Sequence, residues 1–269
     1  MERVLRPPLV MVHGAFCGGW AFDRFRVPFE AKFEVHAPTL RHHGDGQSPP
    51  KALGRTSLLD YAADLETLVE GLDQRPVLVG HSMGGLLAQM LAARGLARAC
   101  VLLAPSAPWG VLPSTVFEFA SAQTLLFSGG DYRGSVIAPS YRIAAAHSLD
   151  RLDEDERDAI YSRFVPESGQ ATFEIMNWNF DMRRAGLVRA RDVTCPVLCV
   201  VGSKDKINPP STVSRVAARY HGRARFEEVR DHSHWLIGEP GWEKVAARAL
   251  TWLDSVLVAD GPAGSSAAS

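Results

Sequence analysis

The stretch VLVGHSMGGLLAQML, residues 77–91, changes its pattern in the middle. Residues 77–79 are apolar without interruption, which is typical of a strand in a sheet covered on both faces. From residue 86 onward the pattern is helical. Between the two lies G-x-S-x-G, in which Gly80 and Gly84 flank Ser82. So tight a turn favours glycine at these positions and pushes the serine oxygen out above the sheet.

Similar short apolar runs alternate with longer helical patterns along much of the chain. Five of them are rich in Val, Leu, Phe and Cys: residues 9–12, 33–36, 100–103, 197–201 and 226–229. Strands that alternate with helices in this way form a doubly wound sheet. The sequence therefore predicts an α/β fold, with a mostly parallel sheet of about six strands and helices on both faces.

Three helices begin at recognisable signals. Ser57 and Asp60 form a capping box ahead of a helical apolar pattern. Asp153 starts a second helix with an apolar side. Pro240 takes a first helical position before a last amphipathic helix, which we expect to close against the sheet.

The alternation of strands and helices stops for roughly 80 residues, a length too great for a simple loop. Residues 108–190 are helical in pattern and rich in aromatic side chains, which predicts an inserted helical cap. The α/β core is then formed by residues 1–107 and 191–258. Residues 259–269 offer nothing to bury, so we expect a disordered tail.

Composition excludes several classes of protein. Apolar residues make up 46% of the 269 residues and charged residues 22%, which is enough apolar surface for a compact fold. A net charge of -1 provides no field that would attract nucleic acid or anionic lipid. Every apolar run is too short to span a membrane. The N-terminal residues run almost directly into a strand and leave no room for a secretory signal, so we expect a cytoplasmic protein.

The four cysteines, Cys17, Cys100, Cys195 and Cys199, lack the spacing of a zinc site and the density of a disulfide scaffold. We interpret them as reduced thiols of the core.

Ser82 is the predicted nucleophile. A serine hydroxyl needs a base to take its proton as a new bond forms, and the base must in turn be held by a carboxylate. For a serine on this type of turn, the acid and then the histidine follow along the chain. Of the two late histidines in DHSHWL, residues 231–236, we choose His234 over His232 because Trp235 and Leu236 lead into the last helix. Asp205 ends the fifth predicted strand, at the edge where α/β sheets place functional loops.

The negative oxygen of a tetrahedral intermediate needs two hydrogen-bond donors. The backbone N–H of Met83, directly after the nucleophile, is the first. The loop HGAF, residues 13–16, ends the first strand, and we expect it to supply the second from Ala15, with Phe16 as the less favoured donor. His13 is expected to bond the backbone of this loop rather than to transfer protons.

Four motifs in this order, HGA, GHSMGG, GSKD and SHW, resemble those of the α/β-hydrolase superfamily across nearly the whole chain. The stretch RHHGDGQS, residues 41–48, is similar to another loop of that superfamily, although its usual R-G-H-G order is altered. The segment HGAFCGGW, residues 13–20, resembles the methylesterase and hydroxynitrile lyase branch. Lyases of that branch carry threonine and lysine where this chain has Gly14 and Trp235, so the resemblance implies the hydrolytic side.

Aspartate at the nucleophile position marks the dehalogenases and epoxide hydrolases of the superfamily, and Ser82 argues against both. The resemblance and the triad together predict a serine carboxylesterase that acts on a small to medium apolar ester and needs no cofactor or metal. We expect the substrate to contact five aromatic residues: Phe16, Trp109, Phe119, Trp178 and Trp235. Histidines in 42–45 and 231–234 are interpreted as polar surface rather than as zinc ligands.

Two alternatives stay open. The same triad serves the hydrolysis of lactones, thioesters and carbon–carbon bonds, as well as perhydrolysis, and the sequence does not separate these leaving groups. A hydrolase-like ligand receptor with vestigial turnover is a different class of function, which an intact triad disfavours.

Overall fold

The main sheet of this protein is all parallel. The structure, a computed structural model, describes residues 6–44, 49–116, 118 and 132–258. The main sheet has six strands in the order β2-β1-β3-β4-β7-β8, and every pairing is parallel. The strands are β1 (Leu9–Val12), β2 (Val35–His36), β3 (Val77–His81), β4 (Ala99–Leu103), β7 (Val197–Gly202) and β8 (Ala224–Val229). The predicted α/β fold with about six strands is therefore confirmed, although β2 is shorter than expected.

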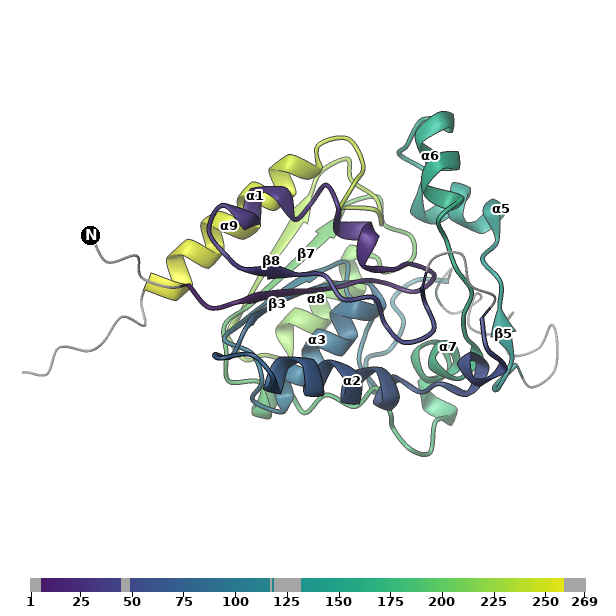
Figure 1. Cartoon of the computed structure of the whole chain (residues 1–269), viewed down its shortest axis with the longest axis horizontal. Helices are drawn as coiled ribbons and strands as arrows, with labels where there is room; N and C mark the ends of the chain where they lie inside the picture. The colour runs from purple at the N-terminus through teal and green to yellow at the C-terminus, as the bar shows by residue number, and fades with distance from the viewer. Residues whose placement is uncertain (1–5, 45–48, 117, 119–131, 259–269) are drawn as a thin grey trace, which may run out of the picture.

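Helices cover both faces of this sheet (Figure 1). One face carries α1 (Val27–Glu30) and α9 (Trp242–Val258), and the other carries α2 (Leu58–Glu70), α3 (Met83–Ala93) and α8 (Pro210–Ala218). Alternate strand residues point to opposite faces, so Val77 and Val79 pack in the cluster that contains α9, whereas Leu78 packs in the cluster with α2 and α3. Both faces being buried explains the uninterrupted apolar runs.

Local signals decide where the helices begin. The Ser57 side chain accepts from the N–H of Leu59 at 3.1 Å, and the Asp60 carboxylate accepts from the N–H of Ser57 at 2.8 Å. This is the predicted capping box. The last helix begins at Trp242, two residues later than the sequence predicts from Pro240. Gly241 has φ of +95°, which is incompatible with an α-helix, so α9 starts after it.

The segment between β4 and β7 lies at one end of the sheet, where Figure 1 shows α5, α6, β5 and α7 together. Its elements are β5 (Val136–Ile137), α5 (Tyr141–Ile143), the π-helix η3 (Ala144–Ser148), α6 (Glu154–Tyr161), β6 (Glu167–Ser168) and α7 (Gly169–Met176). Asp153 caps α6 by accepting from the N–H of Glu156 at 2.8 Å, as the sequence predicts. The antiparallel pairing of β5 with β6 was not predicted, because two-residue strands leave no periodic pattern.

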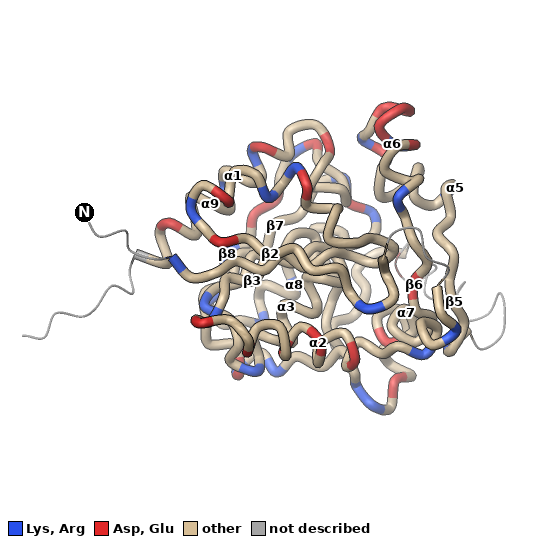
Figure 2. The backbone as a smooth tube through the Cα atoms, viewed as in Figure 1, with Lys and Arg blue, Asp and Glu red and all other residues tan. Residues whose placement is uncertain are grey.

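Short 3₁₀ turns connect several of these elements: η1 (Gly19–Phe22), η2 (Lys51–Arg55), η4 (Trp178–Phe180) and η5 (Ala190–Asp192). The four cysteines are buried and free. Basic and acidic residues alternate along the backbone without a large region of one sign (Figure 2). No helix within the described ranges is long and apolar enough to cross a membrane.

Candidate active site

The turn after β3 holds Ser82 in an unusual backbone conformation. Ser82 has φ of +53° and ψ of -119°, and α3 begins at the next residue, Met83. A Cβ added at Gly80 would lie 2.3 Å from the carbonyl oxygen of Gly84, and one added at Gly84 would lie 2.0 Å from that of Val12. Only glycine fits at these two positions. The sharp turn predicted from G-x-S-x-G is thus present, and it leaves the Ser82 side chain at the wall of a cavity.

A line of hydrogen bonds joins three side chains from distant parts of the chain. Nε2 of His234 lies 3.0 Å from Oγ of Ser82, and Nδ1 of His234 lies 2.9 Å from Oδ2 of Asp205. The carboxylate is an acceptor, so Nδ1 carries the proton and Nε2 faces the serine hydroxyl as an acceptor. His234 and Asp205 are both buried. Of the three residues that the sequence predicts as a triad, His234 therefore lies within hydrogen-bond distance of both Ser82 and Asp205.

The loop after β7 orients Asp205. Its second oxygen, Oδ1, accepts from the backbone N–H of Ile207 at 2.8 Å and of Asn208 at 2.9 Å. Nδ2 of Asn208 donates to the carbonyl of Ala104 at 2.8 Å, which ties this loop to the end of β4. These bonds direct the remaining oxygen of Asp205 toward His234.

His81 holds the loop that carries His234. Its Nε2 donates to the backbone carbonyl of His234 at 2.8 Å, and the two rings lie 4.9 Å apart. Burial, together with the charge that His234 can carry, lowers the pKa of His81 to about 3, so this ring is neutral. This role of His81 was not predicted from the sequence, because a histidine beside the nucleophile gives no sign of its partner.

The residue before His234 has its own anchors. The N–H of Ser233 donates to Oε1 of Glu239 at 2.8 Å, and its hydroxyl donates to Oδ1 of Asp150 at 2.5 Å. Glu239 is buried, and burial raises its pKa to about 7. His232 does not join the Ser82 contact: its Nδ1 faces the carbonyl of Arg230 at 3.0 Å.

The two predicted oxyanion donors belong to the two segments next to the Ser82 side chain, the start of α3 and the loop of residues 13–16. Met83 is the first residue of α3, so its backbone N–H has no acceptor inside the helix. Gly14 and Ala15 line the same cavity as Ser82. A Cβ added at Gly14 would lie 3.0 Å from Cβ of Ser82, which shows how closely this loop passes the serine. His13 is buried and bonds the loop backbone, as the sequence predicts.

A cavity of about 660 Å³ opens over Ser82 and His234. Three of the predicted substrate contacts, Phe16, Trp178 and Trp235, line it. Trp109 is not among the described lining residues and instead packs against Trp178, with ring centroids 5.2 Å apart. Phe119 lies outside the described residues.

Much of the described lining is aliphatic and was not singled out from the sequence. These residues come from separate segments: Val111, Ile137, Ile143, Ile175 and Ile207. Single aliphatic residues at helical or strand spacing resemble ordinary core positions, so only the tertiary arrangement identifies them.

The interpretation of the histidines in 42–45 and 231–234 as polar surface was wrong for His43, His232 and His234, which are buried. Nε2 of His43 faces Oε2 of Glu167 at 3.0 Å, and His234 contacts Asp205 and Ser82. In the part of the chain that the structure describes, no three His, Cys, Asp or Glu side chains form a group suited to a metal ion.

A family model covers most of the chain, and several known proteins are similar to it. Residues 9–248 match the model described as the alpha/beta hydrolase family. Epoxide hydrolase 3 of Xenopus tropicalis is 25% identical over 256 residues, which cover 86% of this chain and 67% of that protein. The magnesium-chelatase 30 kDa subunit of Rhodobacter capsulatus is 26% identical over 272 residues, covering 92% of this chain and 87% of that one. A methylesterase protein of Arabidopsis, MES16, has a similar structure, with a TM-score of 0.71, 15% identity and coverage of 93% and 100%.

Proposed function

Because the chain belongs to the α/β-hydrolase family, we propose that it is a serine carboxylesterase acting on small to medium apolar esters. The observation that carries this proposal is the line of hydrogen bonds from Asp205 through His234 to Ser82, at the wall of a cavity. This arrangement supplies the nucleophile, the base and the group that orients the base.

In the first half of the reaction, Oγ of Ser82 attacks the carbonyl carbon of the ester. Nε2 of His234 takes the hydroxyl proton, and Asp205 stabilises the resulting imidazolium. The negative oxygen of the tetrahedral intermediate accepts hydrogen bonds from the backbone N–H groups of Met83 and Ala15. The bond to the alcohol oxygen then breaks, His234 gives its proton to that oxygen, and the acyl group remains on Ser82.

In the second half, water takes the place of the alcohol. His234 removes a proton from the water, whose oxygen attacks the acyl carbon, and the same two amides bind the negative oxygen again. Collapse of this intermediate releases the carboxylic acid, and His234 returns the proton to Ser82. One ester and one water are consumed, and one acid and one alcohol are formed.

The walls of the cavity favour an apolar substrate. Aromatic residues such as Phe16, Trp178 and Trp235 and several aliphatic residues line the cavity that Ser82 also lines. A volume of about 660 Å³ lies in the range of sites for small organic molecules. These features support small to medium esters over sugars or nucleotides.

The resemblance to an epoxide hydrolase does not extend to the nucleophile that such enzymes use. A carboxylate at that position opens an epoxide and forms an alkyl ester, whereas this chain has Ser82. A serine that is paired with histidine is suited to acyl transfer.

A substrate panel tests the proposal. It contains short-chain and long-chain p-nitrophenyl esters, lactones, acyl thioesters and epoxides, each assayed for kcat/KM. We expect the esters to be hydrolysed fastest and the epoxides to remain intact. Faster turnover of epoxides, or of thioesters over matched oxygen esters, would contradict it. Tight ligand binding without turnover of any member would favour the receptor alternative.

A further inference from the structure

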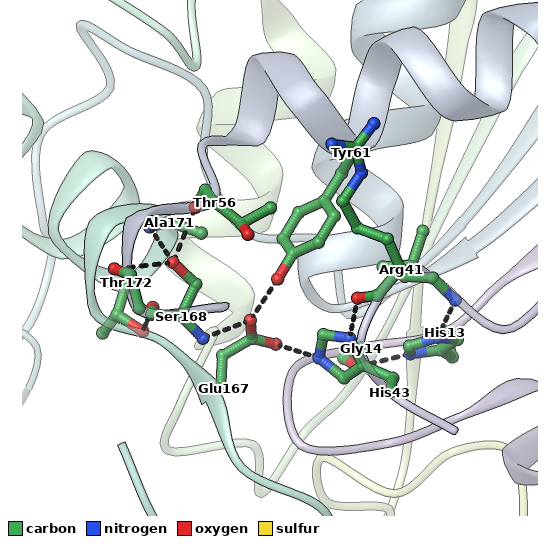
Figure 3. A network of polar contacts seen from close by, with 12 residues as sticks. His13, Gly14, Arg41, His43, Thr56, Tyr61, Glu167, Ser168, Ala171 and Thr172 are labelled. Atoms are coloured by element: carbon green, nitrogen blue, oxygen red, sulfur yellow. Dashed lines mark hydrogen bonds and ion pairs between the residues drawn. The ribbon is translucent and has the colours of Figure 1, made fainter. Parts of the chain in front are cut away.

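Glu167, whose polar contacts are drawn in Figure 3, is a carboxylate outside the proposed triad. Its exposure is 0%. It belongs to β6, in the segment between β4 and β7. Its Oε1 accepts from the hydroxyl of Tyr61 at 2.8 Å and from the N–H of Ser168 at 2.7 Å, and its Oε2 faces Nε2 of His43 at 3.0 Å. A buried carboxylate is costly unless its oxygens are paired in this way. Tyr61 and His43 belong to the core, so Glu167 joins the inserted segment to it.

His43 carries a positive charge in this environment. Its Nδ1 faces the backbone carbonyl of Arg41 at 2.9 Å, and its Nε2 faces Glu167 at 3.0 Å. Both partners are acceptors, so both ring nitrogens carry protons. Burial lowers the pKa of His43, but its hydrogen bond to Glu167 and the charge of that carboxylate outweigh burial and raise it overall. Glu167 and His43 therefore form a buried ion pair.

This pair lies against His13. The rings of His43 and His13 are 5.4 Å apart. Burial and the charge on His43 lower the pKa of His13 to about 4, so His13 stays neutral. Its Nε2 accepts from the N–H of Leu40 at 3.0 Å, which leaves the proton on Nδ1. Nδ1 then donates to the carbonyl of Gly14 at 2.8 Å.

The carbonyl of Gly14 and the N–H of Ala15 belong to one peptide group. In a planar trans peptide the C=O and N–H bonds point in opposite directions. Holding the Gly14 carbonyl against His13 therefore turns the N–H of Ala15 away from that ring. This N–H is one of the two proposed oxyanion donors, and it lies on the loop that lines the cavity over Ser82.

The inserted segment also contacts Phe16, the residue that follows Ala15. The N–H of Val165, two residues before Glu167, donates to the carbonyl of Phe16 at 2.9 Å. Phe16 has φ of +64°, a conformation that is strained for a bulky residue and needs support from its surroundings. We call residues 13–16 the oxyanion loop. Segment 165–167 contacts this loop directly through Phe16 and indirectly through His43 and His13.

We propose that Glu167 is a positioning residue for the oxyanion hole, acting through His43 and His13 on the Ala15 N–H. The inference rests on the proposed acyl transfer at Ser82. It makes the inserted segment part of the catalytic framework, because the oxyanion donor is correctly turned only while β6 is seated on the core. The hydroxyl of Ser168 donates to the carbonyl of Thr56 at 2.6 Å and so keeps β6 in this place.

Glu174 provides a matched control. It is also a buried carboxylate of the inserted segment that binds the core, where it accepts from the hydroxyl of Ser57 at 2.8 Å and from the N–H of Leu58 at 2.7 Å. These contacts lead to the start of α2 and not to the loop 13–16. Replacing Glu174 removes hydrogen bonds between the inserted segment and the core. Replacing Glu167 removes such hydrogen bonds as well, and in addition tests the effect on the oxyanion loop.

The kinetic experiment compares Glu167→Gln with Glu174→Gln. We expect Glu167→Gln to lower kcat by about 10- to 100-fold with KM little changed, on the order of the cost of misplacing an oxyanion donor. A trifluoromethyl ketone, which forms a tetrahedral adduct with the serine, should lose affinity by the same factor as kcat/KM falls. Glu174→Gln should keep kcat within about threefold of the wild type. Equal kcat losses in the two variants, or unchanged affinity for the ketone in Glu167→Gln, would overturn the proposal.

A second measurement does not depend on turnover. Nitrogen NMR of the histidine rings at pH 6.5, the ordinary pKa of histidine, should show His43 mostly doubly protonated in the wild type and in Glu174→Gln but not in Glu167→Gln. The Ala15 amide resonance should move only in Glu167→Gln. Unmoved resonances would contradict the inference even if ester hydrolysis is confirmed. If no ester is hydrolysed while the resonances move as expected, the proposed function fails and the structural coupling stands.

Should Glu167→Gln not fold, Tyr61→Phe removes one donor from the same carboxylate, and a kcat equal to that of the wild type would then contradict the proposal.

Discussion

Nε2 of His81 donates a hydrogen bond to the backbone carbonyl of His234, 2.8 Å away. The two residues are 153 positions apart in the sequence, yet this contact joins the residue before the nucleophile to the proposed base. The turn that presents Ser82 therefore also fixes the loop that presents His234. The backbone around Ser82 therefore contributes, together with Asp205 and the anchors of Ser233, to the placement of the imidazole next to the serine oxygen.

Replacing His81 with Phe should weaken this relationship. Phe keeps a ring against Trp235, which lies 5.7 Å away, but cannot donate to the carbonyl of His234. We expect kcat for a p-nitrophenyl ester to fall about tenfold with little change in KM, because the base is less well placed. His36→Phe, at a half-buried position on β2, is the control and should leave kcat unchanged. An unaltered kcat in His81→Phe would show that the contact has no part in positioning.

Ser82→Ala should reduce ester hydrolysis by about three orders of magnitude or more, the scale of losing a triad member. A fluorophosphonate probe followed by mass mapping should label Ser82 in the wild type and leave the variant unlabelled. Ser162→Ala, at an exposed position after α6, should match the wild type in both assays. Labelling of another residue, or near-normal activity in Ser82→Ala, would place the nucleophile elsewhere.

Replacing His232 and His234 separately by Ala should have very different effects on kcat. Only His234 contacts both Ser82 and Asp205, so its loss should lower kcat by about 1000-fold. His232 faces the carbonyl of Arg230, so His232→Ala should act mainly on stability and keep kcat within about tenfold. Steady-state kinetics and thermal unfolding of both variants check this ranking, and the reverse order would refute the choice of base.

Glu239→Gln should change how stability depends on pH. Burial raises the pKa of Glu239 from 4.5 to about 7, so between these values the folded chain holds a proton that the unfolded chain has released. The contribution of Glu239 to stability therefore falls as pH rises through this range and is constant above it, with a total change on the order of 3 kcal/mol. Glutamine does not titrate, and its oxygen can still accept from the N–H of Ser233.

Urea unfolding at pH 5 and pH 8 measures this effect. The wild type should lose more stability than Glu239→Gln between the two pH values. Glu243→Gln, at an exposed position at the start of α9, should behave as the wild type does. Equal pH dependence in Glu239→Gln and the wild type would mean that Glu239 does not hold its proton in the folded state.

Sequence patterns located the main sheet and the residues nearest the nucleophile. The change from an apolar run to a helical pattern around Ser82 predicted β3, the turn and α3, because a tight turn restricts which residues fit. The order of Ser82, Asp205 and His234 along the chain selected three side chains that the fold brings together. The predicted start of α9 was two residues too early. Pro240 is typical of a first helical position, but the positive φ of Gly241 means that the helix begins only at Trp242.

In the inserted segment, the sequence alone predicted few of the roles of individual side chains. Its aromatic residues were treated alike, but Trp178 lines the cavity and Trp109 packs behind it. Glu167 was not singled out, because a lone glutamate in sequence is usually an exposed one. Its partner His43 lies 124 positions away, and no periodic pattern connects them.

The sequence by itself determined the sheet, the sharp turn and the identity of the side chains that we assign to chemistry, because these follow from local periodicity, glycine sterics and chain order. Only the tertiary structure decided which aliphatic residues form the cavity. It alone also decided that His81 contacts the loop of His234 and that Glu167 contacts His43. Those relationships depend on burial and hydrogen-bond geometry between segments more than 100 residues apart, such as His43 and Glu167 with a separation of 124. Local patterns carry no information about such distances.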